Sequence, residues 1–153
     1  MKYYLAYGSN LNKNQMSFRC WDAIPVGSCM LNNWELVFRR GVLTIEPCPG
    51  GVVPLGIWKI SENDEKSLDR YEGFPRLYRK HMFPILLHGY RDGKEEVTEQ
   101  VGEAMAYIMN AGHKIEEPSM VYMRTCIQGY KDFGFDKAPL MKAYRKSKKG
   151  GDA

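Results

Sequence analysis

The chain has 153 residues, of which 44% are hydrophobic and 26% are charged, and its formal net charge is +4. This length suits one ordinary domain with a hydrophobic core, and no apolar stretch approaches the roughly 18 residues of a membrane-spanning helix. We therefore expect no membrane association. The chain begins directly with a strand-like run and has no secretory signal pattern, so we expect a cytoplasmic protein.

The positive charge belongs to the C-terminal segment. Residues 141–153 contain five Lys and Arg residues against Asp152 alone, which leaves residues 1–140 balanced. Nucleic-acid binding needs a basic face on the folded body, so we expect no nucleic-acid partner. The expected organisation is a single domain over residues 1–140, followed by a basic helix end and tail over residues 141–153, because Lys and Arg suit a helix C-terminus.

Short apolar runs predict that strands dominate the first two thirds of the chain. These runs cover residues 3–6, 24–31, 34–38, 42–45, 52–60, 77–87 and 104–109. Asn32-Asn33 predicts a hairpin between the second and third runs, and the Pro- and Gly-rich segment 47–51 predicts a turn between the fourth and fifth. A polar segment containing Asp92-Gly93 joins the last two runs.

Capping residues predict four helices, one following the first strand, one in the middle and two at the end of the chain. The expected helices cover residues 12–20, 61–73, 118–130 and 136–148. In the second of them, Ser61 is a good N-cap, and Gly73 and Pro75 favour an end. Strands with inserted and terminal helices indicate an α+β domain with a mixed, strongly curved or barrel-like sheet.

The segment Tyr7-Gly8-Ser9-Asn10-Leu11 directly follows the first strand. Gly, Ser and Asn predict a tight loop that tolerates unusual backbone angles. Such a loop can direct successive N–H groups toward one anion or oxyanion, although a simple strand-ending turn has the same local sequence. A phosphate-binding loop is excluded because its longer glycine spacing and its Lys are missing. Ser9 lacks the surroundings of a nucleophilic serine.

Glu72 is the candidate catalytic residue. It lies at the predicted end of a helix, where the helix dipole raises a carboxyl pKa, and aromatic neighbours would desolvate it. A carboxyl group with a raised pKa can accept and return a proton near neutral pH. An exposed Glu beside a helix end is the alternative interpretation of this segment alone. Arg19 and Arg76 are either surface charges or partners for a substrate carboxylate.

The cysteines and histidines are scattered and do not form a metal-ligand pattern. We expect the cysteines to be small buried apolar residues. They are Cys20, Cys29, Cys48 and Cys126. We therefore expect no metal and no cofactor.

From residue 4 to about residue 135 the chain resembles the γ-glutamylcyclotransferase-like family. The matching segments are Tyr7-Gly8-Ser9-Asn10-Leu11, Arg19-Cys20, Gly56-Ile57-Trp58, Leu68-Asp69-x-Tyr71-Glu72-Gly73, Tyr78, Ala106-Tyr107, Pro118-Ser119-x-x-Tyr122 and Ile127-x-Gly129. The resemblance implies a mixed β-barrel flanked by helices, with one pocket at its mouth. It also implies a reaction without metal or cofactor, in which the α-amine of a γ-glutamyl amide attacks the δ-carbonyl and releases 5-oxoproline and an amine or amino acid.

The resemblance implies a role for each matching site residue. Glu72 corresponds to the catalytic glutamate, which acts as general acid and base. The implied substrate-binding residues are Tyr7, Gly8, Ser9, Asn10, Leu11, Tyr78, Tyr107 and Tyr122. The loop N–H groups would hold either the developing oxyanion or the α-carboxylate. The segment between Glu72 and Tyr78 is one residue shorter than in vertebrate-type members.

The expected partner is a small γ-glutamyl substrate, and the chain is expected to be a monomer or a homodimer. One alternative is a catalytically inactive domain of the same fold that binds a small molecule or a partner. Another is an RNA-binding barrel that uses aromatic residues and the basic tail.

Overall fold

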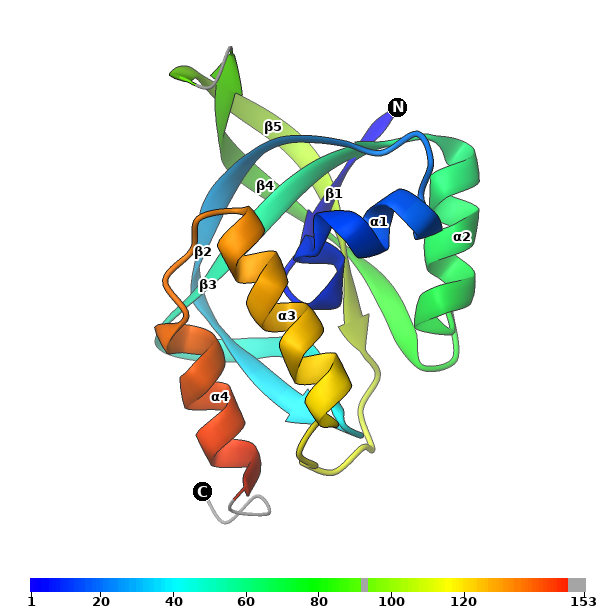
Figure 1. Ribbon diagram of the computed structural model, residues 1–153, viewed down its shortest axis with the longest axis vertical. Helices are drawn as coiled ribbons and strands as arrows, with labels where there is room; N and C mark the ends of the chain where they lie inside the picture. Colours follow the sequence, from blue (N-terminus) through cyan, green and yellow to red (C-terminus); the bar gives the residue numbers. More distant parts are fainter. Residues whose placement is uncertain (92–93, 149–153) are drawn as a thin grey trace.

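In the computed structural model, the backbone is described for residues 1–91 and 94–148, and the side chains for residues 1–89 and 101–148. Within these residues, five strands close into a barrel, with four α-helices and one 3₁₀ helix packed outside it (Figure 1). The elements are β1 (Lys2–Ala6), η1 (Ser9–Leu11), α1 (Lys13–Arg19), β2 (Ile24–Arg39), β3 (Val42–Ile60), α2 (Glu62–Glu72), β4 (Tyr78–Arg91), β5 (Lys94–Met109), α3 (Met120–Asp132) and α4 (Ala138–Lys148).

The strand order around the barrel is β1-β3-β2-β4-β5. Two long hairpins, β2-β3 and β4-β5, supply most of the antiparallel pairing. The short strand β1 lies between them, antiparallel to β3 and parallel to β5, so that Tyr4 pairs with Trp58 on one side and Met105 on the other. The barrel closes where Gly27 and Ser28 of β2 meet β4. This architecture confirms the predicted α+β class with a mixed, barrel-like sheet flanked by helices.

Both turns predicted in the first half of the chain are wrong, because β2 and β3 are continuous. The chain reverses instead at Arg40-Gly41, where both residues have positive φ, as a two-residue hairpin turn requires. The two segments predicted to be turns, Asn32-Asn33 and residues 47–51, instead lie opposite each other in the middle of the β2-β3 hairpin. There residues 48–51 lie opposite Asn33 alone, and Asn33 Oδ1 accepts a hydrogen bond of 3.1 Å from Gly50 N. Left-handed residues here form a bulge that bends the hairpin.

The predicted helix starts are confirmed, because each rests on a local hydrogen bond. Ser61 and Asp64 form a reciprocal capping box, and Gly73 ends α2 with a left-handed backbone (φ 66°). The side chains of Asn12 and Ser119 cap α1 and α3, and Asp136 Oδ1 accepts a hydrogen bond from Ala138 N at the start of α4. Asp92 and Gly93, in the polar segment expected between the last two strands, lie outside the described residues.

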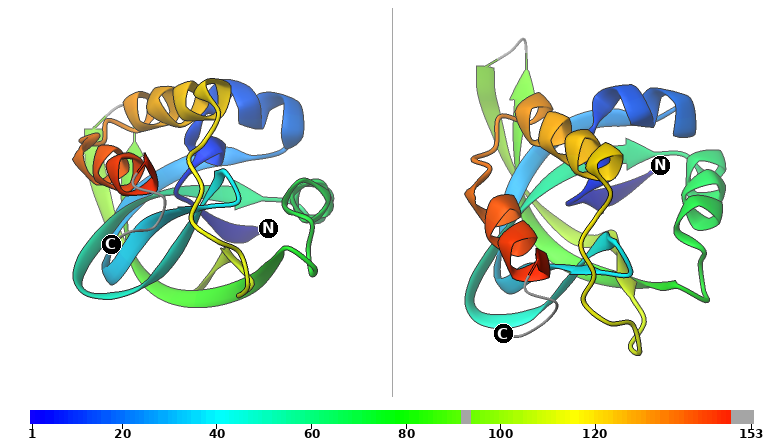
Figure 2. Two further views of the ribbon diagram at one scale, coloured as in Figure 1. Left: turned by 90° about the horizontal axis from the view of Figure 1, so that it is seen from below. Right: turned by 60° about the horizontal axis from the view of Figure 1, so that its bottom comes forward.

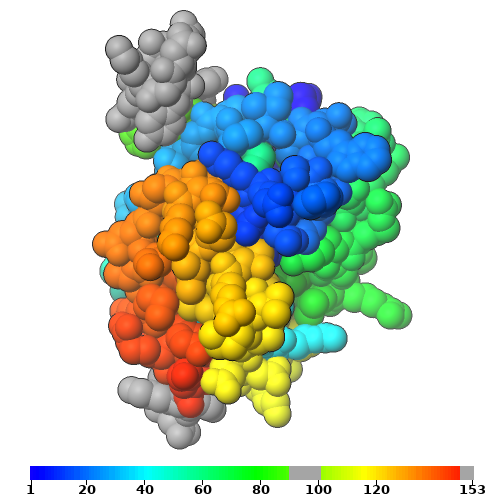
Figure 3. Space-filling model, in the orientation of Figure 1, coloured from blue at the N-terminus to red at the C-terminus, as the bar shows by residue number. Residues whose placement is uncertain are grey.

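Helix α4 connects the basic C-terminal segment to the body of the domain. Its residues Leu140, Ala143 and Ser147 are buried, and it lies against β2 and beside α3 (Figures 2 and 3). The boundary expected after residue 140 therefore falls within a packed helix, and residues 141–148 belong with the body. Residues 149–153 lie outside the described part of the chain.

The loop after β1 is packed between the barrel and α3, and two glycines permit its close approach. A Cβ at Gly56 would lie 2.5 Å from Leu11 Cδ2, and a Cβ at Gly129 would lie 2.7 Å from Asn12 N. Leu11 is fully buried at this contact. The loop is therefore held from the barrel side by β3 and from the outside by α3.

Replacing Gly129 by Ala is expected to lower the free energy of unfolding by about 1–3 kcal/mol because the added methyl group would overlap backbone atoms of the loop. Ala is otherwise favoured over Gly inside a helix by about 1 kcal/mol, so a loss measured by chemical denaturation would report the close contact. Gly102→Ala is the matched control, since a Cβ there meets no described atom within 4 Å. A Gly129→Ala variant as stable as Gly102→Ala would contradict the packing argument.

Candidate active site

A cavity of about 230 Å³ lies at the mouth of the barrel, where the loop after β1 meets the C-terminus of α2 and the start of α3. Its lining comes from both hairpins, α2, α3 and the loop. The lining residues are Tyr4, Tyr7, Gly8, Ser9, Asn10, Val42, Leu43, Tyr71, Glu72, Leu77, Tyr78, Tyr107 and Tyr122. The structure thus brings Glu72 together with every predicted substrate-binding residue except Leu11.

Leu11 has a structural position beneath the pocket. Its side chain is fully buried in the core, and its N–H donates to the Gly8 carbonyl at 3.0 Å. Asn12 N–H is likewise used within the loop, by the Ser9 carbonyl. Leu11 therefore presents neither its side chain nor its N–H to the pocket, contrary to the expected role. A local sequence pattern cannot show which N–H groups of a tight loop donate to carbonyl groups within the loop.

Three N–H groups of the loop remain available. In the part of the chain that the structure describes, no protein acceptor pairs with those of Gly8, Ser9 or Asn10. Trp58 Nε1 donates to the Asn10 carbonyl at 3.0 Å and fixes the loop on the barrel. At Gly8 a Cβ would lie 3.2 Å from Leu43 Cδ1, so a larger residue would narrow the pocket. The loop therefore offers N–H donors from a backbone with little freedom to move.

Glu72 is the last residue of α2, and its side chain lines the cavity. The residue is only partly exposed, and its carboxyl group is surrounded by protein. Burial raises the pKa of Glu72 to about 7, and the guanidinium of Arg19 acts in the opposite direction. Asn10 Nδ2 lies 3.4 Å from Glu72 Oε1 as a hydrogen-bond donor. The carboxyl group can therefore exchange a proton near neutral pH.

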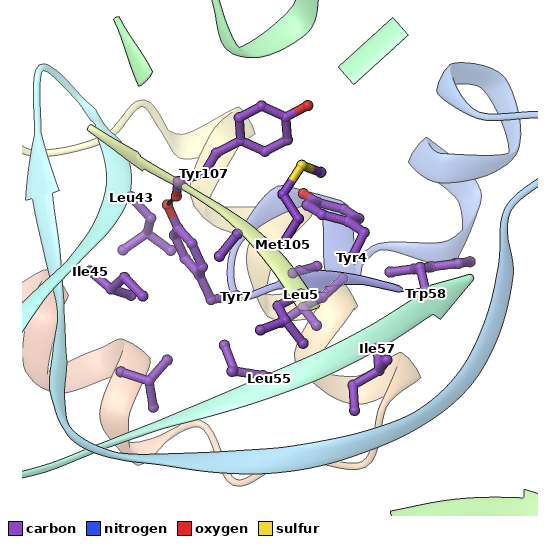
Figure 4. Packing of buried hydrophobic residues seen from close by; sticks show 14 of the residues in the cluster. Tyr4, Leu5, Tyr7, Leu43, Ile45, Leu55, Ile57, Trp58, Met105 and Tyr107 are labelled. Atoms are coloured by element: carbon purple, nitrogen blue, oxygen red, sulfur yellow. Dashed lines mark hydrogen bonds between the residues drawn. The ribbon is translucent and has the colours of Figure 1, made fainter. Parts of the chain in front are cut away.

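Three tyrosine hydroxyls near the cavity donate hydrogen bonds to acceptors within the protein. Tyr7 donates to the Tyr107 carbonyl at 2.6 Å, as seen in Figure 4, and Tyr78 donates to the Leu43 carbonyl at 2.7 Å. Tyr107 donates to Asp69 Oδ1 at 2.6 Å. Because each phenol has one proton, these oxygens can act only as acceptors toward a ligand.

Two other tyrosine hydroxyls accept hydrogen bonds, and these bonds do not use their own protons. Tyr122 Oη accepts from Leu43 N at 3.0 Å, and Tyr4 Oη accepts from Asn10 Nδ2 at 2.8 Å. Burial raises the pKa of both tyrosines well above the ordinary value, so both remain neutral donors. The cavity is therefore divided into acceptors and donors.

Tyr4 and Tyr71 line the cavity but were not predicted from the sequence. Neither was the hydrogen-bond network behind Tyr107. Tyr71 Oη lies 3.0 Å from Ser9 Oγ, and Tyr4 lies beneath Asn10. Asp69, which accepts from Tyr107, also binds Lys80 Nζ at 3.0 Å. Tyr71 and Asp69 belong to the same short segment as Glu72, which was the available signal. Arg19 and Arg76 are absent from the cavity lining.

The described residues contain no cluster of three or more His, Cys, Asp and Glu residues suited to hold a metal ion. Cys20, Cys29 and Cys126 are buried, as expected, and Cys48 is partly exposed. Among the helices in the described part of the chain, none is long and apolar enough to cross a membrane.

Comparison with solved structures supports the fold assignment. A structure titled gamma-glutamyl cyclotransferase has a TM-score of 0.71 and 22% identity, with 96% of this chain and 86% of that chain covered. An uncharacterised human protein has a TM-score of 0.69 and 25% identity over the same shares. A yeast gamma-glutamyl cyclotransferase specific to glutathione has a TM-score of 0.54 and 13% identity, with 98% of this chain and 99% of that chain covered.

No curated protein matches the sequence. A family model described as "Gamma-glutamyl cyclotransferase, AIG2-like" matches residues 4–125, which include the loop after β1, the whole of α2 and the start of α3. That span contains every residue that lines the cavity. The chain therefore belongs to the gamma-glutamyl cyclotransferase, AIG2-like family.

Proposed function

We propose that the protein is a γ-glutamyl cyclotransferase in which Glu72 is the general acid and base. The substrate's α-amine attacks the δ-carbonyl carbon, a C–N bond closes the five-membered ring, and the amide C–N bond breaks. Glu72 takes a proton from the attacking amine and returns it to the leaving nitrogen, which releases 5-oxoproline and an amine or amino acid. The observation that carries this proposal is a carboxyl group of raised pKa inside the cavity.

The reaction demands orientation more than a strong nucleophile. The amine and the carbonyl belong to one molecule, so a site that holds the folded-back conformer makes the step intramolecular. Such orientation can lower a barrier by roughly 7–11 kcal/mol. A cavity of about 230 Å³ with walls from the barrel, α2 and α3 suits the confinement of a small substrate. Neither a metal nor an organic cofactor is needed for this chemistry.

The division of the cavity into donors and acceptors supports one binding direction. The N–H groups of Gly8, Ser9 and Asn10 and the Tyr122 hydroxyl can donate to negative oxygen, either the α-carboxylate or the developing oxyanion. The Tyr7 and Tyr78 oxygens can accept, as can the ionised Glu72 carboxyl. We therefore place the substrate's amine beside Glu72 and its negative oxygen at the loop.

Glu72→Gln keeps the shape and hydrogen-bonding capacity of the side chain but removes proton transfer. We expect turnover to fall at least about 10²-fold. The measurement is mass-spectrometric detection of 5-oxoproline from a panel of γ-glutamyl amino acids and γ-glutamyl amines, which also identifies the leaving group that the site prefers.

Glu62→Gln is the matched control because Glu62 lies at the other end of the same helix and is exposed. It should retain the rate of the unmodified protein. Full activity in a folded Glu72→Gln variant would exclude Glu72 as the catalyst. Substrate-induced thermal stabilisation without product would favour the inactive binding domain.

The acid side of the pH–rate profile should report Glu72. Since the base must be ionised and its pKa is about 7, kcat/KM should fall about tenfold for each pH unit well below pH 7. Steady-state rates between pH 5 and 8 test this expectation. A midpoint near 4.5, the ordinary value for Glu, would contradict the assignment.

The same raised pKa should make Glu72 a source of instability at neutral pH. The folded chain retains its proton up to about pH 7, whereas the unfolded chain loses it near the ordinary Glu value of 4.5, so unfolding becomes easier as the pH rises between these values. Glu72→Gln removes this term, of the order of 3 kcal/mol. Denaturation should show the variant gaining stability over the unmodified protein at pH 8 but not at pH 4. An equal difference at both values would refute this linkage.

A further inference from the structure

Arg19 connects the loop after β1 to the end of α2 from outside the cavity. It is the last residue of α1, and its Nη1 donates to Asn10 Oδ1 while its Nη2 donates to Gln15 Oε1 at 3.3 Å. Its guanidinium carbon lies 3.5 Å from the centre of the Tyr71 ring. Arg19 does not line the cavity, and its side-chain contacts reach the cavity through Asn10 and Tyr71, which do.

The contact with Arg19 decides which way the Asn10 amide points. A guanidinium group has only donors, so it requires the amide oxygen of Asn10. The amide nitrogen then faces the opposite side, where it donates to Tyr4 Oη at 2.8 Å and to Glu72 Oε1 at 3.4 Å. A reversed amide would set two donors against each other at Arg19 and two acceptors against each other at Glu72.

The contact with Tyr71 places the same guanidinium on the helix that carries Glu72. Tyr71 precedes Glu72 in α2, and its hydroxyl lies 3.0 Å from Ser9 Oγ. Tyr71 is 44% exposed, so protein surrounds its ring only in part. A guanidinium over an aromatic face is attracted by the negative charge of the ring's π-electrons. Arg19 thus holds one residue of the loop and the neighbour of the candidate base.

We propose that Arg19 is a positioning residue that fixes the Asn10 amide and the Tyr71 ring, and through them the placement of the Gly8–Asn10 loop relative to the Glu72 carboxyl. The catalytic consequence rests on the proposed function. The effect on Glu72 itself does not, since it concerns the protein without substrate.

Arg19 also differs in charge from the tyrosines around Glu72. The other titratable groups that interact with this carboxyl are tyrosines: Tyr4 and Tyr7 at β1, Tyr78 of β4 and Tyr122 of α3. Burial raises the pKa of each of them, so they are neutral at physiological pH. The positive charge of Arg19 lowers the pKa of the Glu72 carboxyl, against the effect of burial.

Arg19→Gln removes the positive charge and the planar guanidinium that lies over Tyr71. Arg19→Lys keeps a positive charge but has neither the planar group nor a second nitrogen donor. Arg70→Gln is the matched control because Arg70 is an exposed Arg in the last turn of α2 that contacts Ser67. The first readout is ¹³C NMR titration of the Glu72 carboxyl in the substrate-free protein, assigned with Glu72→Gln. The second is the pH dependence of 5-oxoproline formation.

We expect Arg19→Gln to raise the Glu72 pKa, to move the acid limb of the rate profile upward by the same amount, and to lower kcat/KM at least tenfold. Arg19→Lys should leave the Glu72 pKa near that of the unmodified protein but restore only part of kcat/KM. Arg70→Gln should change neither quantity. A folded Arg19→Gln protein with an unchanged Glu72 pKa and an unchanged rate would overturn the proposal. So would a lower melting temperature and rate with an unmoved pKa, which is the signature of a merely structural role.

If Arg19→Gln does not fold, a double-mutant cycle of Arg19→Lys with Asn10→Ala applies the same test. A residue that acts through Asn10 should lose most of its effect on kcat/KM once Asn10 is removed, and additive losses would overturn the proposal. If the unmodified protein forms no 5-oxoproline from any substrate, the proposed function fails. The NMR titration then still decides whether Arg19 governs Glu72.

Discussion

The site depends on how closely the chain after β1 is held between the barrel and α3. Gly56 and Gly129 leave room for Leu11 and the backbone of Asn12, and Trp58 binds the Asn10 carbonyl. These contacts fill the lower side of the loop with protein, while Gly8, Ser9 and Asn10, whose N–H groups have no acceptor among the described residues, line the cavity. Donors fixed before a ligand arrives need no reorganisation during the reaction, which is the main physical advantage of such a site. The barrel therefore contributes rigidity, and the loop contributes the hydrogen bonds.

The burial of Glu72 has an energetic cost, because a carboxylate that is removed from water loses its solvation. The protein surrounds it with neutral tyrosines and sets a single guanidinium outside the cavity. More positive charge would lower the pKa of the carboxyl, so that it would hold a proton less often at neutral pH. Less positive charge would raise that pKa further and favour the protonated form. The pKa of Glu72 thus reflects a balance between desolvation, which raises it, and the Arg19 guanidinium, which lowers it.

How much the sequence predicts follows from the range of the interactions involved. Helix starts at Asn12, Ser61 and Ser119 were predictable because a cap is a contact within three residues. The turns at Asn32-Asn33 and 47–51 were not, since a left-handed residue suits a bulge as well as a hairpin. The contacts of Tyr71 with Ser9 and of Asp69 with Tyr107 join residues far apart in the chain. Family resemblance named most of the residues that line the cavity, but it did not reveal their hydrogen bonds or the buried position of Leu11.

Two of the tyrosines that line the cavity owe their opposite polarity to one backbone residue. The carbonyl of Leu43 accepts from Tyr78, and the N–H of Leu43 donates to Tyr122. A single residue near the start of β3 therefore gives two tyrosines opposite hydrogen-bonding characters, one an acceptor and the other a donor toward the cavity. Because both groups belong to the backbone, this division is kept by any residue at position 43 except proline, which lacks the N–H. It depends instead on the hairpin at Arg40-Gly41, which sets the register of β3 against β2 and so places the Leu43 backbone between β4 and α3.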